Sequence, residues 1–438
     1  MFMKSIPGGV EIDVPWSAPE GWDSHAVIEP DMVFIPMAQG PGDPCSPVVK
    51  AGDRVREGQI ICEADTFVSA YAHASVSGTV REIAEKPQAN GKKTVTVIIE
   101  NDGRHEMAEP LPPAEPTDAE QLRETIRNAG IVGMGGAGFP SHVKVEGGRG
   151  KIDRLILNGS ECEPLLRADA TLMSLHAERI LAGCRIVMAA TGAPKAMVGI
   201  ESNKPEALGA MRRAVQGFTN MEIRELPHIY PMGGEKQLIK ALTGREVPIG
   251  GLPSDAGLLV LNVATAFAVA EAVQRSKTLV RRLCTVAGDV VNPMNMVFPV
   301  GTPVKDALTF CGGMASTASR VIVGGPMMGR AVDRLDVPLT KTSGGLVVIN
   351  QDHDGFRHSE YPCIRCSRCS RACPMALMPQ DIDRAFRVSD VRACERLQAT
   401  TCINCGGCTY VCPSHIPLAA NIVTASQKVK EHKGKNNG

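Results

Sequence analysis

Two copies of one cysteine motif near the C-terminal end of the chain constrain its fold more than any other feature. Each copy reads C-x2-C-x2-C-x3-C-P, the spacing that holds [4Fe–4S] clusters in bacterial proteins. Three closely spaced cysteines bind three corners of one cluster, and the fourth begins a segment that points away and binds the neighbouring cluster. We therefore predict two clusters with exchanged fourth ligands. One is held by Cys363, Cys366, Cys369 and Cys412, and the other by Cys402, Cys405, Cys408 and Cys373.

Two other chemistries also use closely spaced cysteines. Zinc sites pair C-x2-C units across longer gaps and need no third cysteine at the same interval. A disulfide framework is disfavoured because the other cysteines are scattered singly along the chain, which is typical of a reducing compartment.

Composition narrows the classes of function that remain. The 438 residues suffice for two to four domains, and a hydrophobic content of 43% allows a sizeable core. A net charge of zero gives no electrostatic footprint for nucleic acid. The N-terminal stretch lacks an apolar run of signal-peptide length, and the most apolar stretch, 257–273, is short for a membrane span. We expect a cytoplasmic chain that is soluble by itself and could still dock onto a membrane partner.

Short apolar runs separated by turns occupy residues 31–99, a pattern typical of β-strands. The G-D-x-V at 52–55 and the S-G-x-V at 77–80 resemble a biotinyl/lipoyl-type barrel. Carrier domains of that type present a modified lysine at a hairpin tip, but the corresponding hairpin at 65–71 contains no lysine. We therefore predict a structural barrel rather than a swinging carrier.

A glycine-rich loop at 133–140 follows a helix that we expect to begin with a capping box from Thr117 to Glu120 and to stop at Gly130. The loop fits G-x-G-x-x-G, but the dinucleotide fingerprint requires a strand before it, whereas here a helix precedes it and Pro140 follows. Its unshielded backbone N–H groups still predict a concave site for a phosphate or a flat ring. A merely flexible loop is the alternative.

Polar residues also follow two predicted buried strands. The strand at 153–158 ends before Glu161 and Glu163, which lie where α/β folds place their ligands, although solvated turn acids are the alternative. A second buried strand, 258–265, has polar residues at its end, and residues 151–188 have the pattern of a β-α-β unit. The loop at 230–236 opens a helix and is a second candidate anion site.

Three stretches carry a family resemblance: GIVGMGGAGFPSHVK at 130–144, LILNGSECEP at 155–164 and GGEKQLIKALTGREVPIGGLP at 233–253. The barrel lies ahead of them, and a β-grasp pattern and the cysteine motifs lie behind. Over about 30–420 the chain resembles the C-subunit family of the Rnf electron-transport complexes. Its central part is also similar to the flavin-bearing subunit of respiratory complex I, although Met134 and Ser160 stand where that subunit has arginine and aspartate.

In that superfamily the corresponding loops bind FMN noncovalently, and NADH stacks over the flavin. The resemblance implies that the glycine loop lines the FMN, that Lys144 meets its phosphate, and that Asn158 and Glu161 contact its ring and ribityl region. Phe139 and Glu163 match positions that contact NADH. The complete implied set is Gly133, Gly135, Gly136, Gly138, Phe139, Lys144, Asn158, Glu161, Glu163, Gly234, Glu235, Asn262 and Thr265.

The resemblance also implies a function. The chain would oxidise NADH through FMN and pass single electrons through two [4Fe–4S] clusters to a membrane-bound Rnf complex, an ion-translocating NADH:ferredoxin oxidoreductase. Its implied partners are other Rnf subunits, including a ferredoxin-like membrane-associated subunit, with peripheral contact at the cytoplasmic side of the cell membrane. We predict no catalytic side chain, because the cofactors carry the reaction. The alternatives are a proline reductase partner, a cobalamin reductase and a flavin-free iron–sulfur relay.

The expected fold is a multidomain α/β and β chain that ends in a helical ferredoxin-like domain. The expected parts are an N-terminal arm (1–30), a lipoyl-like β-barrel (31–105), a Rossmann-like α/β domain for FMN and NADH (117–280), a β-grasp module of SLBB type (281–350), a two-cluster domain (355–425) and a polar, frayed tail (426–438).

Overall fold

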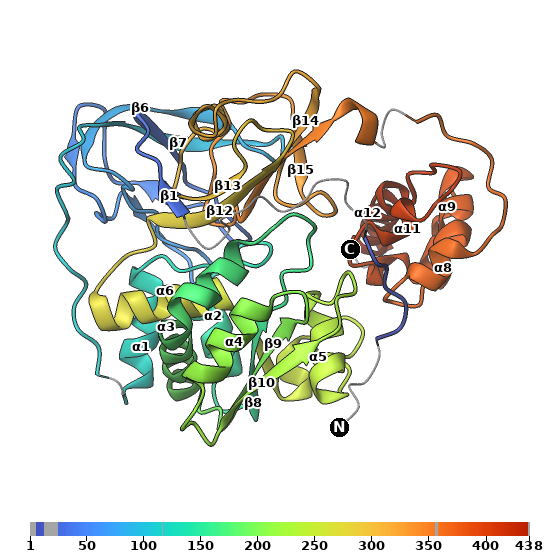
Figure 1. Cartoon of the computed structure of the whole chain (residues 1–438), viewed down its shortest axis with the longest axis horizontal. Helices are drawn as coiled ribbons and strands as arrows, with labels where there is room; N and C mark the ends of the chain where they lie inside the picture. The colour runs from blue at the N-terminus through green and yellow to red at the C-terminus, as the bar shows by residue number, and fades with distance from the viewer. Residues whose placement is uncertain (1–5, 13–24, 116, 355–357, 437–438) are drawn as a thin grey trace.

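The computed structural model describes residues 6–12, 25–115, 117–354 and 358–436. Figure 1 shows the barrel and the β-grasp strands together above an α/β layer, with the helical C-terminal part standing to one side. Residues 1–5 and 13–24 of the expected arm lie outside the described part.

The barrel is built from four very short or five-residue strands and two long ones, β6 and β7. One four-stranded sheet has the order β2-β7-β6-β4, and β3 pairs with β5 beside it. Its core is aliphatic, with Val33, Ile35, Val97 and Ile99 all fully buried. The strands are β2 (Met32–Pro36), β3 (Ser46–Pro47), β4 (Arg54–Val55), β5 (Cys62–Glu63), β6 (Gly78–Pro87) and β7 (Lys93–Asn101).

The α/β domain is organised around a four-stranded, fully parallel sheet of order β10-β9-β8-β11. All carboxyl ends of its strands therefore open on one edge, which is where such sheets bind ligands. Its elements are α1 (Ala119–Asn128), α2 (Ser141–Gly148), β8 (Arg154–Gly159), α3 (Ala168–Thr191), β9 (Lys195–Glu201), α4 (Pro205–Ala214), β10 (Met221–Leu226), α5 (Glu235–Thr243), β11 (Leu258–Asn262) and α6 (Val263–Arg275).

Both faces of this sheet are buried, which explains its nearly continuous apolar strands. Leu155 and Leu157 of β8 face a large core that includes residues of α1, α3, α4 and α6. Ile156, which points to the other face, packs with residues of α5. Figure 1 shows α5 on the opposite side of the strands from α1 and α3. Gly183 lets α3 approach α6 closely, since a Cβ there would collide with the Ala266 carbonyl.

The β-grasp part is a six-stranded mixed sheet of order β1-β13-β12-β16-β14-β15. Its core includes Phe298, which is fully buried, and residues of α7. The elements are β1 (His25–Val27), β12 (Arg281–Gly288), β13 (Met294–Pro299), α7 (Val304–Phe310), β14 (Ala318–Val323), β15 (Arg330–Val332) and β16 (Gly345–Asn350). Residues 25–27, from the expected arm, thus form the edge strand β1, parallel to β13.

The C-terminal domain is helical and carries both cysteine motifs. Its core joins α9, α10 and α12 through residues such as Ile382, Cys394 and Ile422. The helices are α8 (Arg368–Ala372), α9 (Pro379–Arg387), α10 (Val391–Arg396), α11 (Gly407–Tyr410) and α12 (Leu418–Asn436). Of the helices in the described ranges, none has both the length and the apolar character to cross a membrane.

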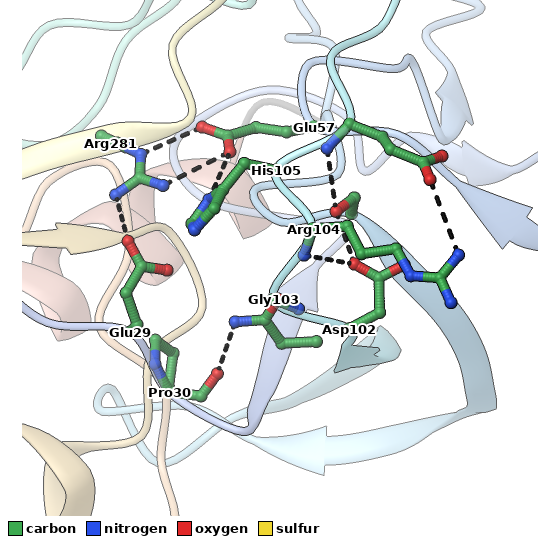
Figure 2. Close-up of polar contacts among 11 residues, drawn as sticks. Glu29, Pro30, Glu57, Asp102, Gly103, Arg104, His105 and Arg281 are labelled. Atoms are coloured by element: carbon green, nitrogen blue, oxygen red, sulfur yellow. Dashed lines mark hydrogen bonds and ion pairs between the residues drawn. The ribbon is translucent and has the colours of Figure 1, made fainter.

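An arginine in β12 fastens the barrel to the β-grasp sheet. Arg281 donates to the Glu57 carboxylate of the barrel from Nε at 3.0 Å and to Glu29 from Nη1 at 3.0 Å, as Figure 2 shows. Burial by itself would lower the pKa of Arg281, but the two carboxylates outweigh burial and raise that pKa above its usual value.

A buried lysine lies where three domains meet. Lys341, which is 2% exposed, donates from Nζ to the Tyr71 carbonyl of the barrel at 2.7 Å and to the Gly130 carbonyl of the α/β domain at 2.8 Å. Burial lowers its pKa to about 8, and the neighbouring thiols Cys62 and Cys45 partly oppose that change. The β-grasp part thereby holds the backbone that leads into the glycine loop.

Three local expectations were wrong. The N-cap of α1 is Asp118, which accepts from the N–H groups of Glu120 and Gln121; Thr117 lies one residue too early. The short apolar run 184–188 belongs to α3, and the next strand is β9, because such a run cannot be assigned to strand or helix by periodicity alone. The polar tail continues α12 as far as Asn436 instead of fraying.

Candidate functional site

Two asparagines mark the ligand-binding edge of the parallel sheet. Asn158 ends β8 and Asn262 ends β11, and the register of the two strands places them directly opposite each other. Asn262 also caps α6, because its Oδ1 accepts from the N–H groups of Ala264 and Thr265. The strand pairing therefore brings together two residues that are distant in the sequence.

The glycine loop lies directly against this edge. The Met134 N–H donates to the Thr265 hydroxyl at 3.0 Å, and a Cβ on Gly135 would lie 2.8 Å from Asn262 Nδ2. Gly136, in contrast, has no neighbouring atom within 4 Å of where its Cβ would stand. The loop is thus fixed at Gly135 and open at Gly136.

The loop before α5 completes the same site. Asn158 Nδ2 donates to the Gly233 carbonyl at 2.9 Å, which ties this loop to the end of β8. Lys144, from α2, forms an ion pair with Glu235 at 3.0 Å, and both side chains are partly exposed. The Lys144–Glu235 ion pair therefore links α2, which follows the glycine loop, to the first residue of α5. Gly234 precedes α5 as its N-cap residue.

The two carboxylates of the acidic turn are engaged by backbone donors. Glu161 accepts from the N–H groups of Asp169 and Ala170 at the start of α3, at 3.0 and 3.1 Å. Glu163 accepts from Met327 and Met328 in the β-grasp part, at 3.0 and 2.8 Å. Burial raises the pKa of each to about 7. Both carboxylates therefore hold the acidic turn in place and are not free in solvent.

Phe139 is the one large apolar side chain of the glycine loop that reaches solvent. It is 38% exposed, and its carbonyl accepts from the Gly133 N–H at 2.9 Å, which closes the loop on itself. Gly138, the preceding residue, has a φ of +81° and packs against Thr342 of the β-grasp part, so only glycine fits there without strain.

A cavity of about 160 Å³ lies beside the acidic turn, beyond the ends of β9 and β10. Lys204 is 4% exposed at its wall and donates to the Leu166 carbonyl at 3.3 Å. Burial lowers the pKa of Lys204, and Glu161 opposes that change. Tyr230 forms another part of the wall. The carboxyl edge of the sheet therefore carries a cavity bordered by the acidic turn.

The residues present fit a flavin mononucleotide. Open space beside Gly136 suits the approach of a flat ring, and the nearby Lys144 suits a phosphate. Glu235 is the one acidic side chain that a phosphate would have to displace from Lys144.

The two cysteine motifs adopt the same backbone conformation. Arg365 and Asn404 occupy equivalent positions with φ of 56° and 55°, and each directs its N–H at the first cysteine of its motif, at 3.4 Å. Ser367 and Gly406, two residues later, are also left-handed, and each precedes a short helix. Such N–H groups aimed at sulfur are what tune clusters held by thiolates.

The structure places the fourth cysteine of each motif beside the other motif. Burial chiefly raises the pKa values of Cys402, Cys405 and Cys408, and the nearby Cys373 sulfur adds to each. Cys412 is likewise close enough to add to the pKa of Cys369, which burial raises most. Buried thiols with raised pKa values need a metal to ionise them at neutral pH.

The arrangement suits clusters better than single ions. Within the described ranges, no three His, Cys, Asp or Glu side chains converge closely enough to hold one metal ion. Each thiolate of a [4Fe–4S] cluster binds a different iron atom, so its ligands stand farther apart than those of a single ion. All 15 cysteines are free thiols, which leaves the eight motif cysteines available as ligands.

Both cysteine motifs contact the α/β domain or the N-terminal segment beside it. The Tyr230 hydroxyl, from the loop before α5, donates to the Cys405 carbonyl at 2.6 Å. Gln237 of α5 reaches the Pro374 carbonyl, and a Cβ on Gly8 would lie 2.5 Å from the Cys373 carbonyl oxygen. The loop that faces Lys144 on one side therefore contacts a cysteine motif on the other.

Sequence reasoning missed several charged residues of this region. Asp169 accepts from Asn262 Nδ2 at 2.6 Å, and Arg282 donates to the Met134 carbonyl at 3.3 Å. Neither residue lies in a recognisable motif. Asp169 is near the start of the helix α3, and Arg282 is near the start of the strand β12. Lys341, far along the chain, could have been suspected only as a lone lysine between two apolar strands.

Comparisons with known proteins agree with this arrangement. Four family models match in succession: the RnfC barrel sandwich hybrid domain over residues 4–104, the Nuo51 FMN-binding domain over 126–271, the SLBB domain over 283–331 and the 4Fe-4S dicluster domain over 362–416. They confirm the predicted fold class, and they confirm FMN and two [4Fe–4S] clusters as the cofactors.

Whole-chain relatives point the same way. The chain is 44% identical over 384 residues to the C-subunit of the proton-translocating ferredoxin:NAD(+) oxidoreductase complex of Clostridium ljungdahlii, covering 86% of this chain and 83% of that one. It is 41% identical to the Na(+)-translocating counterpart of Acetobacterium woodii, covering 81% of each. A crystal structure of an NAD+-reducing [NiFe]-hydrogenase shares the fold, with a TM-score of 0.51 and 20% identity over 72% of this chain and 67% of that one. The chain therefore belongs to the C-subunit family of the Rnf ion-translocating oxidoreductases.

Proposed function

We propose that the chain is the NADH-oxidising electron-transfer subunit of an Rnf complex. It takes electrons from NADH at its FMN site and delivers them singly through two [4Fe–4S] clusters to other subunits of a membrane-bound, ion-translocating ferredoxin:NAD+ oxidoreductase. Its relatives carry names of that activity, which favours this function over a proline reductase partner, a cobalamin reductase or a flavin-free relay.

One observation carries the proposal: a single loop borders both redox sites. Residues 230–235 present Glu235 to Lys144 at the flavin side and the Tyr230 hydroxyl to the Cys405 carbonyl at the cluster side. When bound, FMN accepts two electrons as a hydride and releases them one at a time, which neither NADH nor a cluster can do alone. This shared loop supports a short path from such a converter to a one-electron carrier.

Within the proposed flavin site, the residues of the chain orient the FMN and neutralise the charge of its phosphate, and none of them reacts chemically. We assign the backbone of Gly133, Gly135, Gly136 and Gly138 to the ring face, and Lys144 to the phosphate. Asn158 and Asn262 hold the two loops in register from beneath. Glu161 and Glu163 keep the acidic turn in place through their backbone donors. Phe139, at the rim, is suited to a contact with NADH.

The second cluster follows the flavin in the proposed path, and the first cluster follows the second. The second motif contacts the α/β domain, whereas Cys363 of the first motif is exposed. We infer that electrons leave from the first cluster to a ferredoxin-like, membrane-associated subunit, and that the chain binds peripherally on the cytoplasmic side of the membrane. The working units in this path are the ranges 117–280 for FMN and NADH and 355–425 for the clusters, with the barrel (31–105) and the β-grasp part (281–350) as supports.

The direct test is spectroscopic. Protein purified without oxygen should release FMN on denaturation, and its flavin absorbance should bleach on addition of NADH. Iron should be about eight atoms per chain, as two [4Fe–4S] clusters require. Flavin that is present but not reduced by NADH would refute the dehydrogenase assignment and favour a relay that receives electrons from elsewhere.

A further inference from the structure

The two cysteine motifs differ in what surrounds them. In the first, residues 361–365 are all exposed, including Cys363 itself. In the second, Cys405 and Cys408 are each 8% exposed, and Gly406 lies beside the Met327 carbonyl of the β-grasp part. A cluster held by the first motif is therefore the one that another protein can approach.

The two motifs also differ in charge. The first motif has one arginine between each pair of successive cysteines: Arg365, Arg368 and Arg371. All three arginines are exposed. Across the described ranges none of the three forms an ion pair. The second motif has no charged residue between its cysteines. Positive charge is thus concentrated at one of two otherwise equivalent loops, so cluster binding alone does not require it.

Two exposed apolar side chains lie close to these arginines in the sequence. Ile364 is 67% exposed and Tyr361 is 60% exposed, although exposing large apolar side chains to water is unfavourable. The Tyr361 N–H donates to the Ser414 carbonyl, which holds the segment before the motif in place. An apolar centre with a charged rim is the usual anatomy of a protein interface.

We propose that this surface, formed by Tyr361, Ile364, Arg365, Arg368 and Arg371 and called here the arginine face, docks an acidic iron–sulfur protein. Carboxylates around the partner's cluster would pair with the arginines, and the apolar centre would exclude water between the two clusters. The proposal rests on the proposed function, because it assumes that electrons leave through the first motif. Opposite charges of this kind mainly speed encounter and fix orientation, and they are screened by salt.

The test uses the full chain with both clusters and a purified bacterial two-cluster ferredoxin of strongly negative net charge as the probe. The variant is the double charge reversal Arg365→Glu with Arg368→Glu. The matched control is Arg392→Glu on α10, which is an exposed arginine of the same domain without an ion pair in the described part of the chain. Binding is measured by calorimetry, and electron transfer by the rate of ferredoxin reduction with NADH, each at about 20 mM and 300 mM salt.

The double variant should bind the ferredoxin at least about tenfold more weakly at low salt, and the difference should shrink at high salt. The Arg392→Glu chain should stay within about twofold of the unmodified protein. Equal losses in both variants, or no loss in the double variant, would overturn the proposal. If the charge reversal costs a cluster, Arg365→Gln with Arg368→Gln and the uncharged change Ile364→Ser give the same readout.

Failure of the proposed function would look different. In that case NADH would not bleach the flavin in any of the variants, yet ferredoxin binding would still depend on the arginines. If instead the flavin bleaches normally while ferredoxin binding ignores the arginines, the proposed function stands and the arginine face is not the docking surface.

Discussion

Replacing Cys373 with alanine should remove one cluster, and it should be the cluster of the other motif. Cys373 follows the first motif in sequence, but its sulfur lies beside Cys402, Cys405 and Cys408. Iron should fall from about eight to about four atoms per chain, since a [4Fe–4S] cluster needs its fourth thiolate. Cys412→Ala should cause the same loss by removing the cluster of the first motif.

Exposure tells the two outcomes apart. The cluster left in Cys373→Ala is the one bound near Cys363, which is exposed, whereas the cluster left in Cys412→Ala lies near Cys405 and Cys408, each 8% exposed. A ferrous chelator should strip the first at least about tenfold faster, because the second must open locally and each 1.4 kcal/mol of opening is about a factor of ten. The assay is iron release followed by absorbance under nitrogen, with electron paramagnetic resonance of the reduced chains.

Cys394→Ala is the matched control. It is a buried cysteine of the same domain, 2% exposed, that belongs to neither motif, so this chain should keep about eight iron atoms. If Cys373→Ala retained the slowly stripped cluster and Cys412→Ala the rapidly stripped one, each motif would supply its own fourth ligand, and the exchanged assignment would be refuted.

Three further predictions concern the α/β domain and its supports. Gly136→Ala should leave the melting temperature of the flavin-free protein unchanged, because no protein atom lies within 4 Å of the added methyl group. It should lower the amount of FMN that copurifies, because the methyl group would take up space proposed for the ligand. Gly138→Ala, at φ +81°, should instead cost about 1–3 kcal/mol of stability. Glu201→Gln should stabilise the fold by about 2 kcal/mol more at pH 8 than at pH 5.5. Burial raises the folded-state pKa of Glu201 from 4.5 to about 7, so ionisation of Glu201 weakens the fold as the pH rises through that window. An equal gain at both pH values in thermal melts would contradict this. Lys341→Met should leave the Tyr71 and Gly130 carbonyls without their hydrogen-bond donor, at a cost of about 1–3 kcal/mol of stability for each carbonyl. Hydrogen exchange around 130–138 should therefore become faster. Unchanged protection there would show that the lysine does not hold the glycine loop.

Features that depend on neighbouring residues could be read from the sequence. Cysteine spacing fixes how far apart sulfurs can lie along a loop and its first helical turn, so the two motifs pointed to clusters without any knowledge of the fold. Continuous apolar runs such as 155–157 predicted strands buried on both faces, and the parallel sheet has them there. The order of barrel, α/β, β-grasp and dicluster segments was likewise predicted and is confirmed.

Features that depend on residues distant in sequence were decided only by the tertiary structure. Nothing near Glu163 in the sequence reveals that its carboxylate binds the backbone at 327 and 328, and nothing near Lys341 reveals its two carbonyl partners. The two cysteine motifs have the same spacing, yet packing leaves the first cysteine of one, Cys363, exposed and half-buries its counterpart Cys402. Local sequence restricts backbone angles and ligand spacing, whereas burial, raised pKa values and exposure come from atoms that folding brings together across long stretches of the chain.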